Sequence, residues 1–159
     1  MRNNDAPWGE RRGVQACTFG RKRIVVIGGY KINGGMQEDV WKSHDAGLTW
    51  SRMIQNAPFG ARQKFGLLSD GLSRVLLVGG QAPNSVSWCS SDCAYEDVWL
   101  SDNRGQAWTE QTASLGGRPR CDHQMAFLGA SIPELKGSIG EGPNHSNHSN
   151  QIRIFGIFP

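Results

Sequence analysis

The stretch from Gly28 to Trp50, GGYKINGGMQEDVWKSHDAGLTW, decides the fold because most of it occurs a second time in the chain. Its double glycine returns at Gly79, and its second half returns as EDVWLSDNRGQAW, which ends at Trp108. The two copies are offset by 51 residues at the glycines and by 58 at the final tryptophans. The second copy therefore has seven extra residues between its double glycine and its final tryptophan. Fixed elements joined by one variable connection are typical of a repeat protein.

The repeat divides the chain of 159 residues into three units behind a short lead-in. The third unit begins like the others, runs through a long polar stretch and ends in QIRIFGIFP, which resembles the apolar strand of the first two units. It has Gly156 and Ile157 in place of two glycines and lacks the DVW segment. The divisions are a polar lead-in 1–6, a first unit 7–57, a second unit 58–114 with an inserted loop, and a partial third unit 115–159 with a polar loop 130–150.

Each full unit predicts four short strands and no helix. In the first unit they are Val14–Phe19, Arg23–Ile27, Asp39–Ser43 and Leu48–Met53, in the second Lys64–Ser69, Arg74–Val78, Asp97–Ser101 and Ala107–Gln111. The fold class is therefore all-β, and four strands in about 50 residues match an antiparallel β-propeller blade with its first strand innermost. Residues expected in the core are Ile27, Val40, Trp50, Val78, Val98 and Trp108. Since propellers close with about four to eight blades, we expect this propeller to be incomplete and to need blades from a longer protein or another copy.

The double glycines, the DVW segments and the later tryptophans resemble the Kelch repeat of galactose-oxidase-like propellers. The glycines that carry this resemblance are Gly28, Gly29, Gly79 and Gly80. Glycine is expected there because a Cβ would collide with a neighbouring chain or forbid a positive φ.

A second resemblance lies in the turn before each final tryptophan. SHDAGLTW fits the Asp-box (BNR) pattern S-x-D-x-G-x-T-W of sialidase-like propellers, and SDNRGQAW fits it in part. The matching residues are Ser43, Asp45, Gly47, Thr49 and Trp50, and then Ser101, Asn103, Gly105 and Trp108. The resemblance implies a structural hairpin at the blade periphery, in which the Asp or Asn oxygen accepts backbone N–H bonds and the Trp packs beneath.

Three arginines, Arg11, Arg62 and Arg120, precede the first strand of each unit. In a Kelch-like propeller the first strand lines the central channel, so the resemblance implies a ring of guanidinium groups suited to an acidic ligand. The alternative is that each arginine ties neighbouring blades together through backbone carbonyls. Asp39 and Asp97 open the DVW strands and are expected to accept bonds from turn amides.

The inserted loop of the second unit is the expected partner site. It holds Trp88 and Tyr95, and Tyr30 lies in the corresponding loop of the first unit. Three residues lie between Cys89 and Cys93, a spacing that leaves a disulfide, free thiols or half a metal site open. A disulfide is favoured, and no metal or other cofactor is predicted.

Composition and charge restrict the remaining classes. A net charge of +3 from scattered cations indicates no nucleic-acid partner, and no apolar run approaches the roughly 20 residues of a membrane span. The first residues do not resemble a signal peptide. The sequons at Asn144 and Asn147, the close cysteine pair and the Asp-box turns nevertheless favour an extracellular over a cytoplasmic protein, with the compartment left open.

The function predicted from these features is a non-catalytic binding or scaffold module that contacts a protein or glycan through loops on one propeller face. The alternative is a fragment of a glycan-active enzyme, either a sialidase-like hydrolase or a galactose-oxidase-like oxidase. The chain has only two tyrosines and offers no complete set of residues for either reaction, which favours the binding module.

Overall fold

The computed structural model describes residues 6–83, 94–116, 121–128 and 151–155, which contain strands and turns but no helix. The first antiparallel sheet has the order β1-β2-β5-β6, from β1 (Gln15–Phe19), β2 (Arg23–Ile27), β5 (Val40–Ser43) and β6 (Ser51–Ile54). The second has the order β10-β9-β8-β7, from β7 (Gly66–Ser69), β8 (Val75–Gln81), β9 (Ala94–Ser101) and β10 (Thr109–Thr112). The prediction of an all-β chain with antiparallel sheets is confirmed.

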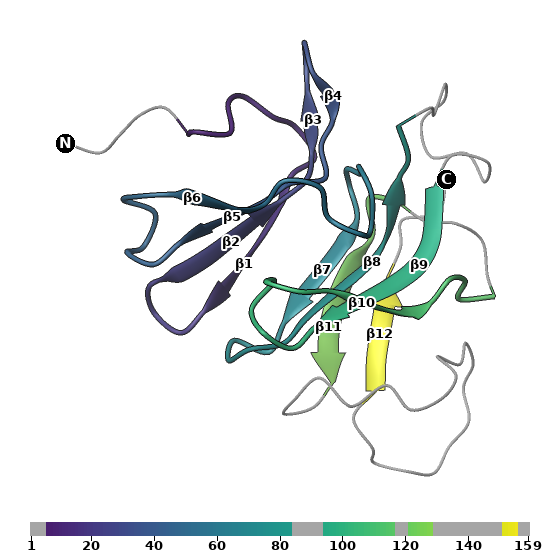
Figure 1. Ribbon diagram of the computed structural model, residues 1–159. Helices are drawn as coiled ribbons and strands as arrows, with labels where there is room; N and C mark the ends of the chain where they lie inside the picture. The colour runs from purple at the N-terminus through teal and green to yellow at the C-terminus, as the bar shows by residue number, and fades with distance from the viewer. Residues whose placement is uncertain (1–5, 84–93, 117–120, 129–150, 156–159) are drawn as a thin grey trace.

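Two smaller strand pairs complete the fold. β11 (Gln124–Leu128) pairs antiparallel with β12 (Gln151–Phe155), as β1 pairs with β2 and β7 with β8. β3 (Tyr30–Lys31) and β4 (Gly35–Met36) form a hairpin that projects beyond the end of the first sheet (Figure 1). No helix long and apolar enough to cross a membrane occurs in the part of the chain that the structure describes.

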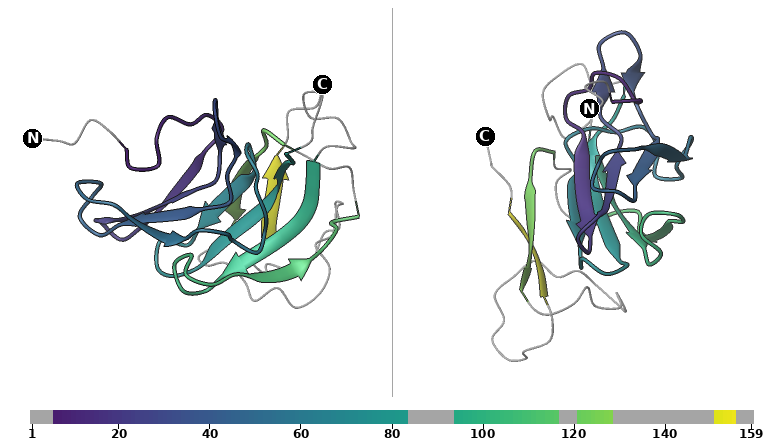
Figure 2. Two further views of the ribbon diagram at one scale, coloured as in Figure 1. Left: turned by 45° about the horizontal axis from the view of Figure 1, so that its top comes forward. Right: turned by 90° about the vertical axis from the view of Figure 1, so that its left-hand side faces the viewer.

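The strand pairs of the three units lie side by side, with β1 against β7 and β7 against β11 (Figure 1, Figure 2). One backbone position marks each junction. Gly13, Lys64 and Asp122 all have positive φ, and the N–H of Lys64 donates to the carbonyl of Gly13 at 3.0 Å while that of Asp122 donates to Lys64 at 2.8 Å. Because these residues have the spacing of the sequence repeat, each junction is made in the same way.

Two layers of apolar side chains hold these sheets together. The first lies between the two four-stranded sheets, and its buried members include Cys17, Phe19, Val25, Ile27, Val40, Phe59, Phe65, Val75, Leu77 and Trp108. The second lies on the other face of the second sheet, around Leu76, Val78 and Val98, with Met125 packed against it. Five of the six residues expected in the core are buried, but Trp50 is only partly buried because it lies on the far face of the first sheet, where its covering partner is Trp8.

The double glycines are required by both backbone conformation and space. Gly28 and Gly29 have φ values of +58° and +93°, and Gly79 and Gly80 have +57° and +102°. A Cβ on Gly28 would lie 2.7 Å from the carbonyl oxygen of Arg62, which belongs to the backbone of the next unit. Here the chain of the second unit closes onto the end of β2.

Replacing Gly28 with alanine should therefore lower the free energy of unfolding by about 2–4 kcal/mol, since left-handed strain and overpacking act together. Gly71→Ala is the matched control, because Gly71 has a φ of +75° and no atom lies within 4 Å of its added Cβ. The control should lose only about 1–2 kcal/mol. Chemical denaturation of both variants measures the difference, and equal losses would contradict the steric explanation.

Candidate functional site

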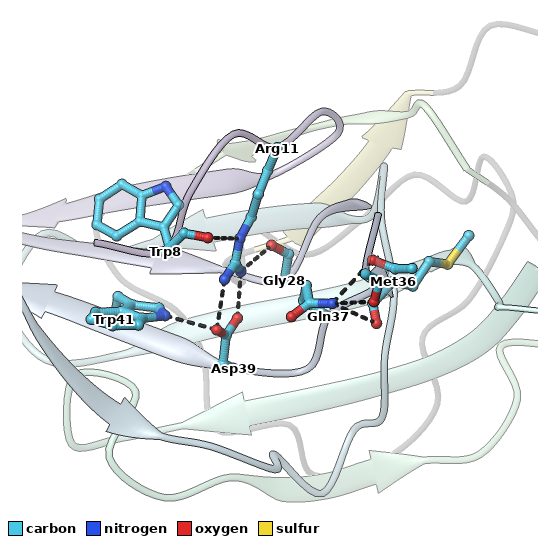
Figure 3. Close-up of polar contacts among 9 residues, drawn as sticks. Trp8, Arg11, Gly28, Met36, Gln37, Asp39 and Trp41 are labelled. Carbon is cyan, nitrogen blue, oxygen red and sulfur yellow. Dashed lines mark hydrogen bonds and ion pairs between the residues drawn. The ribbon is translucent and has the colours of Figure 1, made fainter. Parts of the chain in front are cut away.

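A buried arginine lies at the same place in each of the first two units. Arg11 forms a two-pronged ion pair with Asp39, with Nη1–Oδ1 and Nη2–Oδ2 distances of 2.5 and 2.7 Å (Figure 3). Its Nη1 also donates to the carbonyl of Gly28 at 3.0 Å, and its Nε donates to that of Trp8 at 3.2 Å. The indole N–H of Trp41 donates to the same carboxylate at 2.8 Å.

The second unit repeats this arrangement with the equivalent residues, although a different arginine nitrogen reaches the carbonyl before the first strand. Arg62 pairs with Asp97 at 2.7 and 2.8 Å, donates to the carbonyl of Gly79 at 2.8 Å and also donates to that of Phe59. The indole N–H of Trp99 donates to Asp97 at 2.8 Å. The arrangement links the segment before the first strand, the double glycine and the start of the DVW strand of one unit.

The geometry of these two clusters leaves the arginines no free face for a ligand. The side chain of Arg11 is 1% exposed and that of Arg62 is 0% exposed. They do not present the ring of free guanidinium groups expected for an acidic ligand. Their carbonyl partners lie within their own unit, so they brace a unit rather than tie two units together; Arg120 lies outside the described residues.

The aspartates also differ from their expected role, because Asp39 and Asp97 accept from arginine and tryptophan side chains instead of turn amides. Burial alone would raise the pKa of Asp39, but hydrogen bonds from Arg11 and Trp41 and the positive charge of Arg11 lower it below its ordinary value. A carboxylate with a lowered pKa and its oxygens already occupied is poorly suited to general acid catalysis near neutral pH.

The surface next to the first cluster is formed by the β3–β4 hairpin. Tyr30 forms a backbone bridge with Arg12, whose guanidinium lies 4.6 Å from the centre of the tyrosine ring. The side chain of Gln37 closes the hairpin by donating to the carbonyls of residues 34, 35 and 36 (Figure 3). Ile32 at the tip is 69% exposed. We call Arg12, Tyr30 and Ile32 the hairpin surface.

The second unit differs at this surface. The positions of Arg12 and Tyr30 are taken by Gln63 and Gln81, which are buried and joined by an amide hydrogen bond of 2.8 Å. Tyr95 covers Arg62, whose guanidinium lies 4.0 Å from the centre of its ring. Of the residues predicted for a partner site, Tyr30 and Tyr95 are thus placed beside the arginine clusters, whereas Trp88 lies outside the described residues.

The turns from Ser43 to Trp50 and from Ser101 to Trp108 share one hydrogen-bond pattern. In the first, Asp45 accepts from the N–H of Thr49 at 2.9 Å and from its hydroxyl at 2.5 Å, while Gly47 donates to the Ser43 hydroxyl at 2.8 Å. In the second, Asn103 accepts from the N–H of residue 107 at 2.9 Å. Each tryptophan donates to the carbonyl of the turn glycine, Gly47 or Gly105. All of the carboxylate's bonds are therefore internal to the turn, which leaves it a structural role.

The carboxylate of Asp45 gives this turn a dependence on pH. Hydrogen bonds from the hydroxyl and N–H of Thr49 and from Ser43 lower its pKa from 3.8 to about 2. A lowered folded-state pKa contributes stability above the unfolded-state value, and that stability is lost as the pH falls towards the folded-state value. We expect the stability difference between the wild type and Asp45→Asn to shrink between pH about 4 and about 2. A difference in unfolding midpoint that stays constant over this range would contradict the assignment.

The cysteines fall into two environments. Cys17 is free and buried in the first core layer, where burial raises the pKa of its thiol to about 12 and makes it unreactive. Cys121 is disulfide-bonded, although its isolated position in the sequence did not predict a bond. The predicted Cys89–Cys93 bond lies outside the described residues, as do the sequons at Asn144 and Asn147.

Peptide mapping of the oxidised protein should link Cys121 to Cys89 or to Cys93. The chain has four cysteines, and the thiol of Cys17 is free, so these are the two candidates within the chain. Mass spectrometry of a nonreduced digest identifies the linked peptides. A Cys89–Cys93 peptide together with a free Cys121 thiol would contradict this expectation.

Known proteins give no evidence about the function of this chain. No protein-family model matches the chain, and no curated protein does. A solved structure described as the structure of YjhT has a TM-score of 0.36 and 10% identity, and the match covers 76% of this chain and 60% of that chain. The present chain therefore spans less than two thirds of that protein. Among the described residues, no group of three His, Cys, Asp or Glu side chains is placed to hold a metal ion.

Proposed function

We propose that this chain is part of a β-propeller and serves as a non-catalytic binding module for a protein or glycan. The observation that carries the proposal is the repetition of the buried arginine cluster, with its paired aspartate and tryptophan, in two units. Groups that would be candidates for catalysis or for binding an acidic substrate are used in the same structural way in each unit. Chemistry confined to one active site does not call for such repetition.

The propeller part of the proposal is supported by the two faces of the first sheet. One face is covered by the second unit, which contributes Phe59 and Trp108. The far face presents the corresponding residues Trp8 and Trp50, with ring centroids 4.5 Å apart. In the second unit, the equivalent face with Phe59 and Trp108 is covered by the first sheet. We therefore expect a further blade to cover the face with Trp8 and Trp50 in the first unit.

The binding part is supported by the hairpin surface. An exposed isoleucine and a tyrosine paired with an arginine lie together at one end of the first sheet. The second unit builds the same position from two buried glutamines, so the fold itself does not require the aromatic and cationic side chains. Tyrosine and arginine are among the residues enriched in binding hot spots.

The test is a pull-down and a glycan array with the wild type and with Tyr30→Ala, Ile32→Ser and Trp88→Ala. If a ligand is captured, at least one variant should weaken it by about tenfold or more, as loss of a hot-spot residue does. Leu72→Ser is the matched control for Ile32→Ser, because Leu72 is 73% exposed in the turn between β7 and β8. Equal binding by all variants would place the partner site elsewhere, and turnover of a glycan by the chain would contradict a non-catalytic role.

A further inference from the structure

A small crevice lies between the first two sheets, at the end of β2 opposite to the hairpin surface. It has a volume of about 150 Å³, and its apolar wall includes Val25 and Met53. Four basic side chains line it, Arg23 at the start of β2, Lys42 and His44 at the end of β5, and Arg104 in the turn before β10. The crevice is thus built by both units and is separate from the proposed partner site.

The crevice carries a positive charge that its own walls do not neutralise. No acidic residue lines it, and none of its four basic residues takes part in an ion pair between described residues. The nearest acid in sequence is Asp45, whose carboxylate is occupied by Thr49 and Ser43. Arg104 uses its Nε to donate to the carbonyl of residue 72 at 2.9 Å.

The repeat shows that the fold does not require this charge. In the second unit, the positions of Lys42 and His44 are taken by Leu100 and Asp102. In the first unit, the position of Arg104 is taken by Ala46, with φ values of 62° and 61° at the two sites. A structural charge should recur in both units, as Arg11 and Arg62 do. Lys42, His44 and Arg104 instead have no basic counterpart in the other unit, and all three line this crevice.

The backbone at Arg104 strengthens this argument. A positive φ is unfavourable for a long side chain and common for glycine or asparagine. The turn imposes that conformation, as Ala46 shows, so arginine is a poor choice for the turn itself. The side chain lies on the wall of the crevice, where its Nε donates to the carbonyl of residue 72 and its two terminal nitrogens make no hydrogen bond to a described residue.

We propose that this crevice binds an oxyanion, the sulfate or phosphate group of a small ligand or sugar. Guanidinium and ammonium groups form charge-assisted hydrogen bonds with such oxygens, and arginine can engage two at once. The crevice is smaller than the roughly 300–1,000 Å³ of sites that enclose a drug-sized ligand. It therefore admits one charged group while the remainder of the ligand lies outside.

Isothermal titration calorimetry of the whole chain tests the site with inorganic sulfate, inorganic phosphate, glucosamine 6-sulfate and glucose 6-phosphate. Binding of the sulfates or of the phosphates supports the proposal, and the preferred arm identifies the source of the oxyanion. Lys42→Leu and Arg104→Ala, which exchange each residue for its counterpart in the other unit, should each weaken binding by about tenfold. Their unfolding midpoints should stay close to that of the wild type.

Arg52→Gln is the control for charge alone. Arg52 is exposed on β6 and lies over the ring of Trp41, on the face of the sheet away from the crevice. Its replacement should leave the dissociation constants unchanged. No heat of binding with any of the four probes would overturn the proposal. An equal loss of affinity in all three variants would do so as well, because it would show general attraction of anions to a basic protein.

Discussion

Replacing Arg62 with methionine should lower the free energy of unfolding by about 3–5 kcal/mol, as removal of one partner from a buried ion pair does. The variant leaves the Asp97 carboxylate beside the core with one indole N–H for compensation, and it frees the carbonyls of Phe59 and Gly79. Domain stabilities are commonly about 5–15 kcal/mol, so a loss of this size removes a large fraction of the total stability. Urea denaturation followed by tryptophan fluorescence measures it.

Two further variants separate the ion pair from general loss of charge. Arg12→Met removes the same charge from the first unit, where the exposed guanidinium lies over the ring of Tyr30, and should cost less than about 1 kcal/mol. Arg62→Met combined with Asp97→Leu should recover part of the loss, because no buried charge is then left without its partner. The double variant could instead lose more free energy of unfolding than Arg62→Met and Asp97→Leu lose when their separate losses are added. That result would show that the carboxylate has other essential partners.

The strands were predictable from sequence because their signals are local. The run Arg23–Ile27 forms β2 with those bounds, and the double glycine marks the place where the next unit crosses. The fourth strand was placed too early, at Leu48 instead of Ser51, because the turn side chains hold the backbone up to Trp50 in their own hydrogen-bond pattern. The β3–β4 hairpin was treated as a loop, since two-residue strands leave almost no periodic pattern.

The arginine clusters were not predictable in the same way, because their partners are 28 and 35 residues apart and meet only after the sheet has formed. A signal was nevertheless present. Arg11 and Asp39 are both repeated, as Arg62 and Asp97, and repetition of opposite charges at fixed places favours a mutual contact. The basic crevice is marked by a difference between the units instead, because the position of Lys42 is taken by Leu100 in the second unit. Residues that are the same at equivalent positions of the two units indicate a structural role, and residues that differ there indicate a function of one unit.

Trp108→Ala should also lose about 3–5 kcal/mol, the usual effect of removing a buried aromatic side chain. Trp108 is 8% exposed in the first core layer, packs edge-on against Phe59 at 5.1 Å and donates to the carbonyl of Gly105 at 3.1 Å. Its removal opens a cavity between the two sheets and leaves a buried carbonyl without its donor. Thermal and urea unfolding of the variant give the loss directly.

The decisive comparison is Trp50→Ala, because the two tryptophans are equivalent in the repeat. Trp50 makes the same bond to the turn glycine at 3.0 Å and packs edge-on against Trp8 at 4.5 Å, but it is only partly buried on the far face of the first sheet. In the chain alone its removal should cost only about 1–2 kcal/mol, since less apolar surface returns to water. In a protein that supplies a covering blade, the loss should rise to that of Trp108→Ala. Equal losses in the isolated chain would show that the far face is already covered and would remove the need for a further blade.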